Sequence, residues 1–322
     1  MSSNFLTQAQ TKHLTIKEQV GLAPYTTIKI GGPARYFLAA ASVEELVTAA
    51  TLARACDIPL RVIGKGANIL ISDKGFSGLA IVNTSKNMEM NGTTVTADSG
   101  LSLGVLVAKT AAAALSGLET LAGVPATVGG AVHHNAGTRQ GEIRSTVARV
   151  FILDQKNGQT RWLTAPQCDF QYRKSMFGDH PEFIILRVEF HLTTADKKTV
   201  QKKMTENLTY KHKSQNYDQP TSGCTFKNYI FKNEVDRTKA EKMGLEAGLG
   251  QDRLHSGWLI DQMGFKGRAI GRAQVSTTHA NFILNLGGAT AEDVIMLIGL
   301  IKQKARIAYG IQLQEEIEYM GF

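Results

Sequence analysis

Residues 117–142, GLETLAGVPATVGGAVHHNAGTRQGE, hold six glycines in 26 residues. A shorter glycine turn, Gly64-Lys65-Gly66-Ala67-Asn68, lies between two apolar runs that are typical of strands. Glycine permits positive φ, and successive backbone N–H groups can then converge on an anion. Neither segment matches the P-loop, and the shorter one lacks the third glycine of a Rossmann fingerprint. The two segments are therefore either ordinary turns or two loops that hold the diphosphate of a cofactor.

Strand and helix patterns alternate around these glycines. Residues 26–32 and 34–40 are rich in β-forming types, and Ser42 with Glu45 predicts a capping box at the start of a helix. Further strands are predicted at 58–64, 69–72, 79–84, 93–100, 147–155, 183–192, 279–286 and 313–320, and further helices at about 102–115, 196–212 and 290–309. This order predicts an α+β fold with a boundary near residues 195–215.

The composition narrows the class of protein. A chain of 322 residues has room for two or three domains. It contains no run of eighteen apolar residues, and its N-terminus lacks the layout of a signal peptide. Three cysteines, Cys56, Cys168 and Cys224, form neither a disulfide framework nor a metal-binding spacing. We therefore expect a cytoplasmic protein without a metal site and without a membrane partner.

The formal charge of +8 is mostly scattered along the chain. One modest cluster comprises Lys202, Lys203, Lys211 and Lys213. It is either a solvated basic face or a contact for a small phosphorylated ligand. A nucleic-acid-binding module usually concentrates its charge in a patch, often with aromatic residues, so the sequence disfavours one.

The segment PTSGCTFKN, residues 220–228, places a lone cysteine after a turn of small residues. Cys224 is either a small apolar residue of a strand or a thiol that the turn aims at a ligand. Free cysteine is among the most buried residue types, so the residues alone favour the first reading.

Seven motifs occur in a fixed order from about residue 20 to the C-terminus: TTIKIGGPA, GKGANILISDKGFSG, GLETLAGVPATVGGAVHHNAG, QYRKSMF, SGCTFKN, GFKGRAIGRAQVSTTHANFILN and GIQLQEEIEYMG. In this the chain resembles the UDP-N-acetylenolpyruvoylglucosamine reductases. The resemblance implies an α+β fold of the vanillyl-alcohol-oxidase type, with FAD-binding subdomains at 1–84 and 85–200 and a UDP-sugar-binding domain at 201–322. It corresponds to the shorter subgroup of the family, which lacks a tyrosine loop.

The resemblance also implies an activity. NADPH would reduce non-covalently bound FAD, which would then reduce the enolpyruvyl ether of UDP-N-acetylglucosamine enolpyruvate to UDP-N-acetylmuramate for peptidoglycan synthesis. A flavin suits this task because it stores the hydride between two ligands. No obligate protein partner is implied. The alternative is an FAD oxidoreductase of the same fold that acts on another sugar or alcohol.

The resemblance carries two sets of binding residues over to this chain. The FAD-binding set is Gly64, Lys65, Gly66, Ala67, Asn68, Ile69, Gly123, Val124, Pro125, Ala126, Thr127, Gly129, Gly130, Asn135 and Gly137. The substrate-binding set is Tyr172, Lys211, Gln215, Lys227 and Asn228.

Three catalytic positions follow from the same motifs. Arg173 would hold the enolpyruvyl carboxylate with its planar fork. Glu316 would complement the negative charge of the intermediate or orient the donor, while Glu315 points to the other face of the strand. Cys224 falls where most relatives place a proton-donating serine. A thiol with an ordinary pKa of about 8.5 is mostly protonated at neutral pH and can donate.

The chain departs from the family pattern in several places. Glu318 stands where an arginine is expected, Asn216 and Tyr229 replace prolines, and His133-His134 replace other residue types. The passage from Tyr229 to His255 is longer than is usual. Its charge and weak apolar pattern predict a mobile surface excursion at the rim of the substrate cleft, outside the core.

Overall fold

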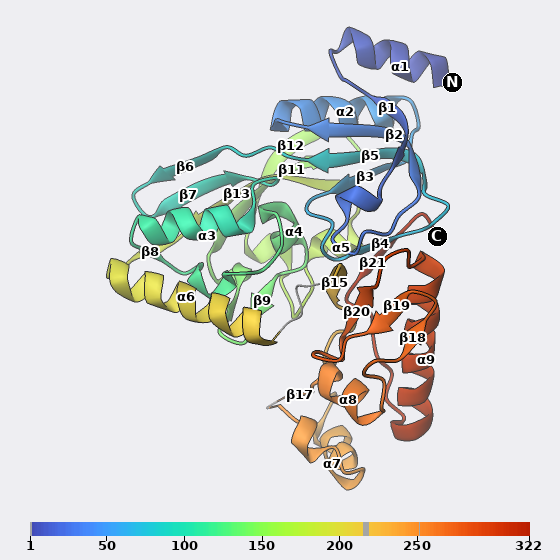
Figure 1. The fold of residues 1–322 in the computed structure, drawn as a ribbon. Helices are drawn as coiled ribbons and strands as arrows, with labels where there is room; N and C mark the ends of the chain where they lie inside the picture. Colours follow the sequence, from blue (N-terminus) through green and yellow to red (C-terminus); the bar gives the residue numbers. More distant parts are fainter. Residues whose placement is uncertain (1, 215–218, 251) are drawn as a thin grey trace. The chain divides into compact units, whose positions relative to one another are not determined.

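The structure is a computed structural model that describes residues 2–214, 219–250 and 252–322 (Figure 1). The chain forms two compact units, each built from separated stretches. The first comprises Met1–Val20, Ala34–Lys65 and Phe76–Lys211, and the second Gly21–Pro33, Gly66–Gly75 and His212–Phe322. Residues 21–33 and 66–75, expected in the first FAD-binding subdomain, thus pack in the second unit. The three-part division stays a prediction.

The first unit begins with a four-stranded sheet of order β1-β2-β5-β3. Its strands are β1 (Lys17–Gly21), β2 (Pro33–Ala40), β3 (Leu60–Ile63) and β5 (Phe76–Asn83). β5 pairs in parallel with both β2 and β3. Helices α1 (Ser2–Thr11) and α2 (Val43–Ala55) share a core with this sheet, which includes Tyr36, Leu46 and Leu79.

An antiparallel sheet of order β12-β11-β13-β7-β6 completes the first unit. Its strands are β6 (Met88–Asn91), β7 (Thr94–Asp98), β11 (Val147–Asp154), β12 (Gln159–Thr164) and β13 (Phe183–His191). These strands share a core with residues of α3 (Leu103–Ala112), α4 (Val128–His133), α5 (Met176–Asp179) and α6 (Lys197–Ser214). Short pairs join β8 (Leu115–Ser116) to β14 (Thr193–Thr194) and β9 (Gly137–Thr138) to β10 (Gly141–Glu142), and 3₁₀ turns lie at Glu119–Leu121, Ile143–Ser145 and Pro166–Cys168.

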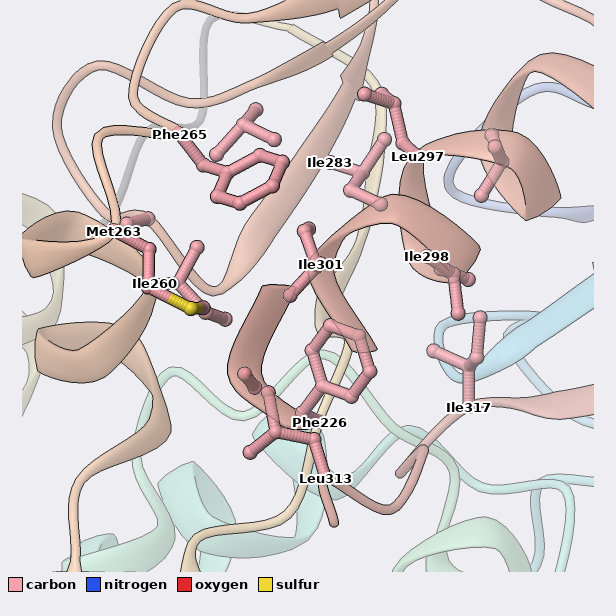
Figure 2. Close-up of a cluster of buried hydrophobic side chains, with 14 of the residues drawn as sticks. Phe226, Ile260, Met263, Phe265, Ile283, Leu297, Ile298, Ile301, Leu313 and Ile317 are labelled. Atoms are coloured by element: carbon pink, nitrogen blue, oxygen red, sulfur yellow. The ribbon is translucent and has the colours of Figure 1, made fainter. Parts of the chain in front are cut away.

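The second unit contains a sheet of order β15-β20-β19-β18, with β15 (Thr221–Cys224), β18 (Ala269–Ile270), β19 (Ala273–Val275) and β20 (Phe282–Asn285). The long helix α9 (Ala291–Tyr309) turns Leu297 and Ile301 toward Ile283 and Phe226, and Ile298 toward Ile317 (Figure 2). The second unit also contains the helices α7 (Glu234–Lys242) and α8 (Ser256–Gln262) and 3₁₀ turns at Ala23–Tyr25 and Glu246–Gly248. Two further strand pairs belong to it, the antiparallel β16 (Tyr229–Ile230) with β17 (Arg253–Leu254) and the parallel β4 (Ile69–Ile71) with β21 (Glu318–Met320).

The α+β class predicted from the sequence is confirmed, as are the long helices. α9 begins with a full capping box of Thr290 and Asp293. At α2 the Ser42 hydroxyl accepts from the Glu45 N–H at 3.1 Å as expected, but the Glu45 carboxylate accepts from Ala41 rather than from Ser42. Among the described residues, no helix has the length and apolar character that crossing a bilayer would require.

The prediction of a strand at residues 26–32 is wrong. The Thr26 hydroxyl bonds to the Ile30 carbonyl across a tight loop, and Lys29 has a left-handed φ of 60°. Ile28 and Ile30 are buried in the core of the second unit. Their alternation therefore reflects insertion into a core rather than pairing in a sheet. Of the strand predicted at 313–320, only the end forms β21.

The expectation that residues 229–255 lie outside the core is also wrong. Ala240, Leu245 and Leu254 are buried with the residues of α8 and α9. The Trp258 ring packs so closely on Gly248 that a Cβ there would lie 2.1 Å from it. These apolar contacts are widely spaced along a charged sequence, which is why the pattern looked like a surface excursion.

Candidate functional site

The shorter glycine turn is shaped by residues that precede β2. Gly66 has a φ of +64°, and a Cβ on it would lie 2.1 Å from the Tyr25 carbonyl oxygen. The Gly66 carbonyl accepts from the Thr27 N–H at 3.0 Å. Among the described residues, no group accepts a hydrogen bond from the backbone N–H of Gly66 or Ala67. This turn therefore fits the diphosphate of a cofactor, which needs N–H donors and a close approach of the backbone.

The longer glycine segment uses its glycines differently. At the start of α4, the Val128 and Gly129 N–H groups donate to the Leu101 and Ser99 carbonyls, both at 2.8 Å. The Gly130 N–H donates to the Thr127 hydroxyl at 3.2 Å. These three amides are thus bonded within the protein. Gly129 lacks a side chain because a Cβ would lie 2.8 Å from the Cβ of Ser99.

The two glycine segments touch at Gly64 and Thr127. A Cβ on Gly64 would lie 2.4 Å from Oγ1 and 3.2 Å from Cγ2 of Thr127. The Gly64 backbone does not have a left-handed φ, so its glycine is required by this neighbour rather than by its own conformation. Thr127 therefore has two roles: its hydroxyl caps α4, and its side chain packs against Gly64.

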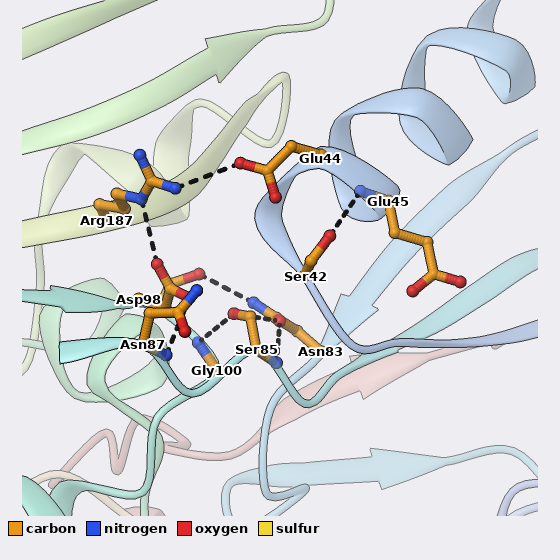
Figure 3. A network of polar contacts seen from close by, with 10 residues as sticks. Ser42, Glu44, Glu45, Asn83, Ser85, Asn87, Asp98, Gly100 and Arg187 are labelled. Carbon is orange, nitrogen blue, oxygen red and sulfur yellow. Dashed lines mark hydrogen bonds and ion pairs between the residues drawn. The ribbon is translucent and has the colours of Figure 1, made fainter.

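A buried polar network joins the end of β5 to the residues that follow β7 (Figure 3). The Asn83 side chain donates to the Ser99 hydroxyl at 2.8 Å and accepts from the Ser85 hydroxyl at 2.8 Å. The Ser85 hydroxyl accepts from the Gly100 N–H. The Ser99 carbonyl also accepts from the Gly129 N–H, so this network helps to fix the position of the first turn of α4.

The neighbouring ion pair ties β7 and β13 to α2 (Figure 3). Arg187 donates to the buried Asp98 at 3.1 Å and to the exposed Glu44 at 3.2 Å. The other Asp98 oxygen accepts from the Asn87 N–H at 3.0 Å. The buried carboxylate is thus paired and hydrogen-bonded, which a buried charge requires.

The Glu119 side chain holds the N-terminal end of the longer glycine segment. Burial raises the pKa of its carboxyl, but hydrogen bonds from the Gly117 N–H and the Ser116 hydroxyl outweigh this and hold the pKa below its ordinary value. These bonds are 2.6 and 2.7 Å long. The carboxylate therefore closes the turn at the end of β8.

Arg173 lies at the tip of a tight turn in which Gln171 and Lys174 exchange backbone hydrogen bonds. Its φ is 53°, a left-handed conformation that is costly for a residue with a side chain. The guanidinium donates to the Gly137 carbonyl at 2.8 Å and lies over the ring of Tyr172. The turn thus brings Arg173 and Tyr172 to the glycine segment at Gly137.

Asn135 holds this turn from the other side. Its side-chain NH₂ donates to the Gln171 carbonyl and to Glu142, and its oxygen accepts from the Arg144 N–H. Asn135 is fully buried and also has a left-handed φ. Its side chain therefore serves the protein's own architecture.

Lys211, the other predicted substrate-binding residue of the first unit, lies near the end of α6. The Lys211 side chain passes over Gly123, where a Cβ would lie 3.1 Å from its Cδ. The Asn207 side chain, one turn earlier, fastens α6 to the Glu119 carbonyl and to Gln140. Gln215 lies outside the described residues.

In the second unit, Cys224 ends β15 opposite Phe282 and is half-buried. It differs from Cys168, which is fully buried and whose pKa is raised to about 12 by that burial. The chain after Cys224 is clamped by Asn281. The Asn281 carbonyl accepts from Thr225, and its side chain bonds to both the N–H and the carbonyl of Phe226.

Glu316 lies beside this strand. Its N–H donates to the Thr225 carbonyl at 2.8 Å, and its carbonyl accepts from the Asn68 side chain at 2.9 Å. The neighbouring Glu315 forms an ion pair with Lys302 on α9. Within the second unit, the structure thus brings together the Cys224 strand, Glu316 and residues 66–68 of the shorter glycine turn, here named the cofactor turn. The Glu318 N–H donates to the Asn68 carbonyl, and its side chain is exposed.

Lys227 and Asn228 meet the start of α8. The Ser256 hydroxyl donates to the Lys227 carbonyl, and the Asn228 side chain accepts from the Ser256 N–H at 3.1 Å. Ser256, Asn281 and Thr27 were missed by the sequence analysis. Thr27 and Asn281 lie inside two of the family motifs, whereas Ser256 lies outside all seven, so its residue type gave no signal.

Two family models match parts of this chain, and full-length relatives are similar to it. Residues 34–164 match a family model for an FAD binding domain, and residues 215–320 match that for the UDP-N-acetylenolpyruvoylglucosamine reductase C-terminal domain. The UDP-N-acetylenolpyruvoylglucosamine reductase of Halalkalibacterium halodurans is 34% identical over 308 residues, covering 95% of this chain and 94% of the relative. That of Carboxydothermus hydrogenoformans is 35% identical over 322 residues, covering 98% of each.

A solved structure gives the same result. The reductase of Thermus caldophilus superposes with a TM-score of 0.76 at 31% sequence identity, covering 96% of this chain and 100% of that one. The expected FAD-binding fold with a separate C-terminal domain is confirmed.

Proposed function

The chain belongs to the UDP-N-acetylenolpyruvoylglucosamine reductase family, and from this membership we propose that it reduces UDP-N-acetylglucosamine enolpyruvate to UDP-N-acetylmuramate with NADPH, in peptidoglycan precursor synthesis. The observation that carries the proposal is the pairing of an FAD binding domain with the reductase C-terminal domain in a chain that spans nearly the whole of its relatives.

FAD, when bound, supplies the carrier that links oxidation of NADPH to reduction of the enolpyruvyl double bond. The residues present suit it. Gly66 and Ala67 offer backbone N–H groups, and the close neighbours of Gly64 and Gly66 exclude side chains from the turn. Lys65, Asn68 and Ile69 complete this turn, and Gly123 to Gly137 contribute the second segment.

Cys224 is proposed as the proton donor. Addition of hydride to one carbon of the alkene requires a proton at the other, and a protonated thiol can provide it. Cys224 is half-buried at the end of a strand, next to Gly223 with its φ of 76°. Cys168, by contrast, is fully buried in the core of the first unit.

Arg173 is proposed to bind the carboxylate of the enolpyruvyl group. Its strained backbone and its bond to Gly137 fix the direction of the guanidinium before the substrate arrives. A fixed guanidinium stabilises negative charge that develops during the reaction without having to reorganise. Tyr172, Lys211, Gln215, Lys227 and Asn228 are proposed to bind the rest of the UDP-sugar.

Glu316 is proposed to complement the intermediate or to orient the proton donor. Its backbone bond to Thr225 places it beside the strand that carries Cys224. Glu315 is engaged with Lys302, which leaves the role to Glu316 of the two adjacent carboxylates.

The function is tested by visible absorption of the purified protein. We expect a flavin spectrum that NADPH bleaches and that UDP-N-acetylglucosamine enolpyruvate restores. Bleaching without restoration by this substrate would contradict the proposal and favour an oxidoreductase of the same fold with another substrate.

The role of Cys224 is tested by separating the two half-reactions in stopped flow. Cys224→Ala should leave reduction of the flavin by NADPH intact and slow its reoxidation by substrate by about 10²- to 10⁴-fold, the usual contribution of a general acid. Cys224→Ser should recover much of this loss. Cys56→Ala serves as the matched control and should change neither half. Equal slowing of both halves by Cys224→Ala would make Cys224 a structural residue.

A further inference from the structure

Thr27 contacts Thr221, which lies 194 residues away in the sequence within the second unit. Its N–H donates to the Gly66 carbonyl at 3.0 Å. Its hydroxyl lies 2.7 Å from the Thr221 carbonyl and 3.3 Å from the Gly66 carbonyl. A hydroxyl has one proton to donate, and the shorter distance assigns it to Thr221. Thr27 thus holds the cofactor turn with its backbone and β15 with its side chain.

The bond to Thr221 falls at the last regular pair before β15 departs from its register with β20. In the ladder between β15 and β20, Thr221 pairs with Leu284 and Cys224 with Phe282, so the register shifts between the two pairs. Such a bulge leaves the extra residue outside the regular hydrogen bonding. Ser222 and Gly223, which precede the thiol, lie in this bulge. Within the bulge, the Gly223 N–H donates to the Thr221 hydroxyl at 3.3 Å, so the position of the bulge depends on what holds Thr221 and Thr225.

The far end of the bulge has an anchor of its own. Thr225 donates to the Asn281 carbonyl at 2.7 Å and accepts from the Glu316 N–H at 2.8 Å. Glu316 in turn accepts from the side chain of Asn68. At the near end, the Pro220 carbonyl accepts from the Asn285 N–H at 2.9 Å, and the Thr221 carbonyl accepts from the Thr27 hydroxyl at 2.7 Å. The cofactor turn, Gly66 to Asn68, is hence joined to both sides of Cys224.

We propose that Thr27 is a positioning residue for the thiol of Cys224: its hydroxyl relates the location of the thiol-bearing bulge to that of the cofactor turn. This inference rests on the proposed function, because it takes Cys224 as the proton donor. Thr27 itself touches neither proton nor substrate. It acts by fixing the carbonyl of Thr221, from which the bulge begins.

Thr27→Val tests the inference, because it replaces the hydroxyl by a methyl group of similar size and keeps the N–H bond to Gly66. Thr27→Ser, which restores a hydroxyl, is the matched control. We expect Thr27→Val to keep FAD affinity and flavin reduction by NADPH within about threefold of the parent. Reoxidation by substrate should slow by about 10- to 100-fold, the scale of a small misplacement of a reacting group. Thr27→Ser should return it to near the parent rate.

A second readout requires no substrate. The rate at which iodoacetamide labels Cys224 in the FAD-loaded protein, followed by mass spectrometry of its peptide, should rise severalfold in Thr27→Val and remain unchanged in Thr27→Ser. If the parent fails to act on the enolpyruvyl substrate but this labelling pattern holds, the proposed function fails while the positioning role stands.

The inference is overturned if Thr27→Val slows both half-reactions equally, or if it leaves the labelling of Cys224 unchanged. Thermal unfolding of each variant shows whether it is folded. Should Thr27→Val not fold, Thr27→Ala is measured in its place, with the same expected split between the half-reactions and the same overturning results.

Discussion

The contact between Gly64 and Thr127 gives a quantitative prediction about cofactor binding. Gly64→Ala adds one methyl group, whose carbon would lie 2.4 Å from Oγ1 of Thr127. Carbon atoms of side chains do not approach so closely, so Thr127 must move. Because the φ of Gly64 is outside the left-handed region, alanine strains no torsion there. The whole cost therefore comes from this one contact.

The size of the effect follows from the two roles of Thr127. Inserting a methyl group into a packed region typically costs about 1–3 kcal/mol. Because FAD binding requires the parent geometry of this turn, the same cost should lower the affinity for FAD by about 5- to 150-fold. Thr127→Ala alone loses the cap on Gly130, which costs about 0.5–2 kcal/mol of stability. In the double variant Thr127 has lost both atoms that the new methyl group would strike, so Gly64→Ala should add little further cost.

The assay is FAD affinity by quenching of flavin fluorescence, with thermal unfolding of the FAD-free protein alongside. Gly104→Ala is the matched control, because the added Cβ would meet, outside the backbone of its own helix and among the described residues, just the Ser102 hydroxyl at 3.8 Å. It should bind FAD like the parent. The reasoning would be refuted if the loss of FAD binding free energy in the double variant equalled the sum of the losses in the two single variants, since this would show that the residues act independently.

Three further outcomes are expected. Gly66→Val should weaken FAD by at least about tenfold, because valine is strained at φ +64° and meets the Tyr25 carbonyl; parent affinity in a folded variant would contradict this. Replacing residues 231–253 by a short linker should lower the free energy of unfolding by more than about 2 kcal/mol, because it removes Leu245 from the core; a parent-like denaturation midpoint would count against it. Glu119→Gln should destabilise by about 1–3 kcal/mol at neutral pH. Because the folded-state pKa of Glu119 lies below its unfolded value, this difference should shrink as pH falls through the folded-state pKa, and a constant difference across a pH series would refute the assignment.

The sequence predicted the elements that local pattern determines. α9 has an apolar stripe, a capping box at Thr290 and a left-handed Gly310 at its end, and all three signals agree. The paired strands β11 and β13 are long and strongly apolar. Residues 26–32 and 229–255 were mispredicted because their apolar residues serve cores built by distant segments. No local period records such a contact.

The site shows the same limit. A glycine-rich sequence does not distinguish a glycine that offers its amide from one that makes room for a neighbour. Gly66 has an amide without an acceptor among the described residues, whereas Gly129 is small because of Ser99. Thr27 and Asn281 act through hydrogen bonds to remote backbone, so their residue types alone gave no reason to single them out.

The make-up of the second unit explains why its proposed catalytic residues depend on the N-terminal part of the chain. β21 pairs with β4, and Ile28, Ile30 and Leu70 fill the core beneath α9. Residues 212–322 therefore lack a strand partner and part of their core unless the stretches 21–33 and 66–75 are present. One of these stretches carries the cofactor turn and the other carries Thr27. Residues 66–75 thus contain both the backbone N–H groups proposed to bind the diphosphate and the side chains that complete the fold around Cys224 and Glu316, so cofactor binding and the position of Cys224 depend on the same short stretch.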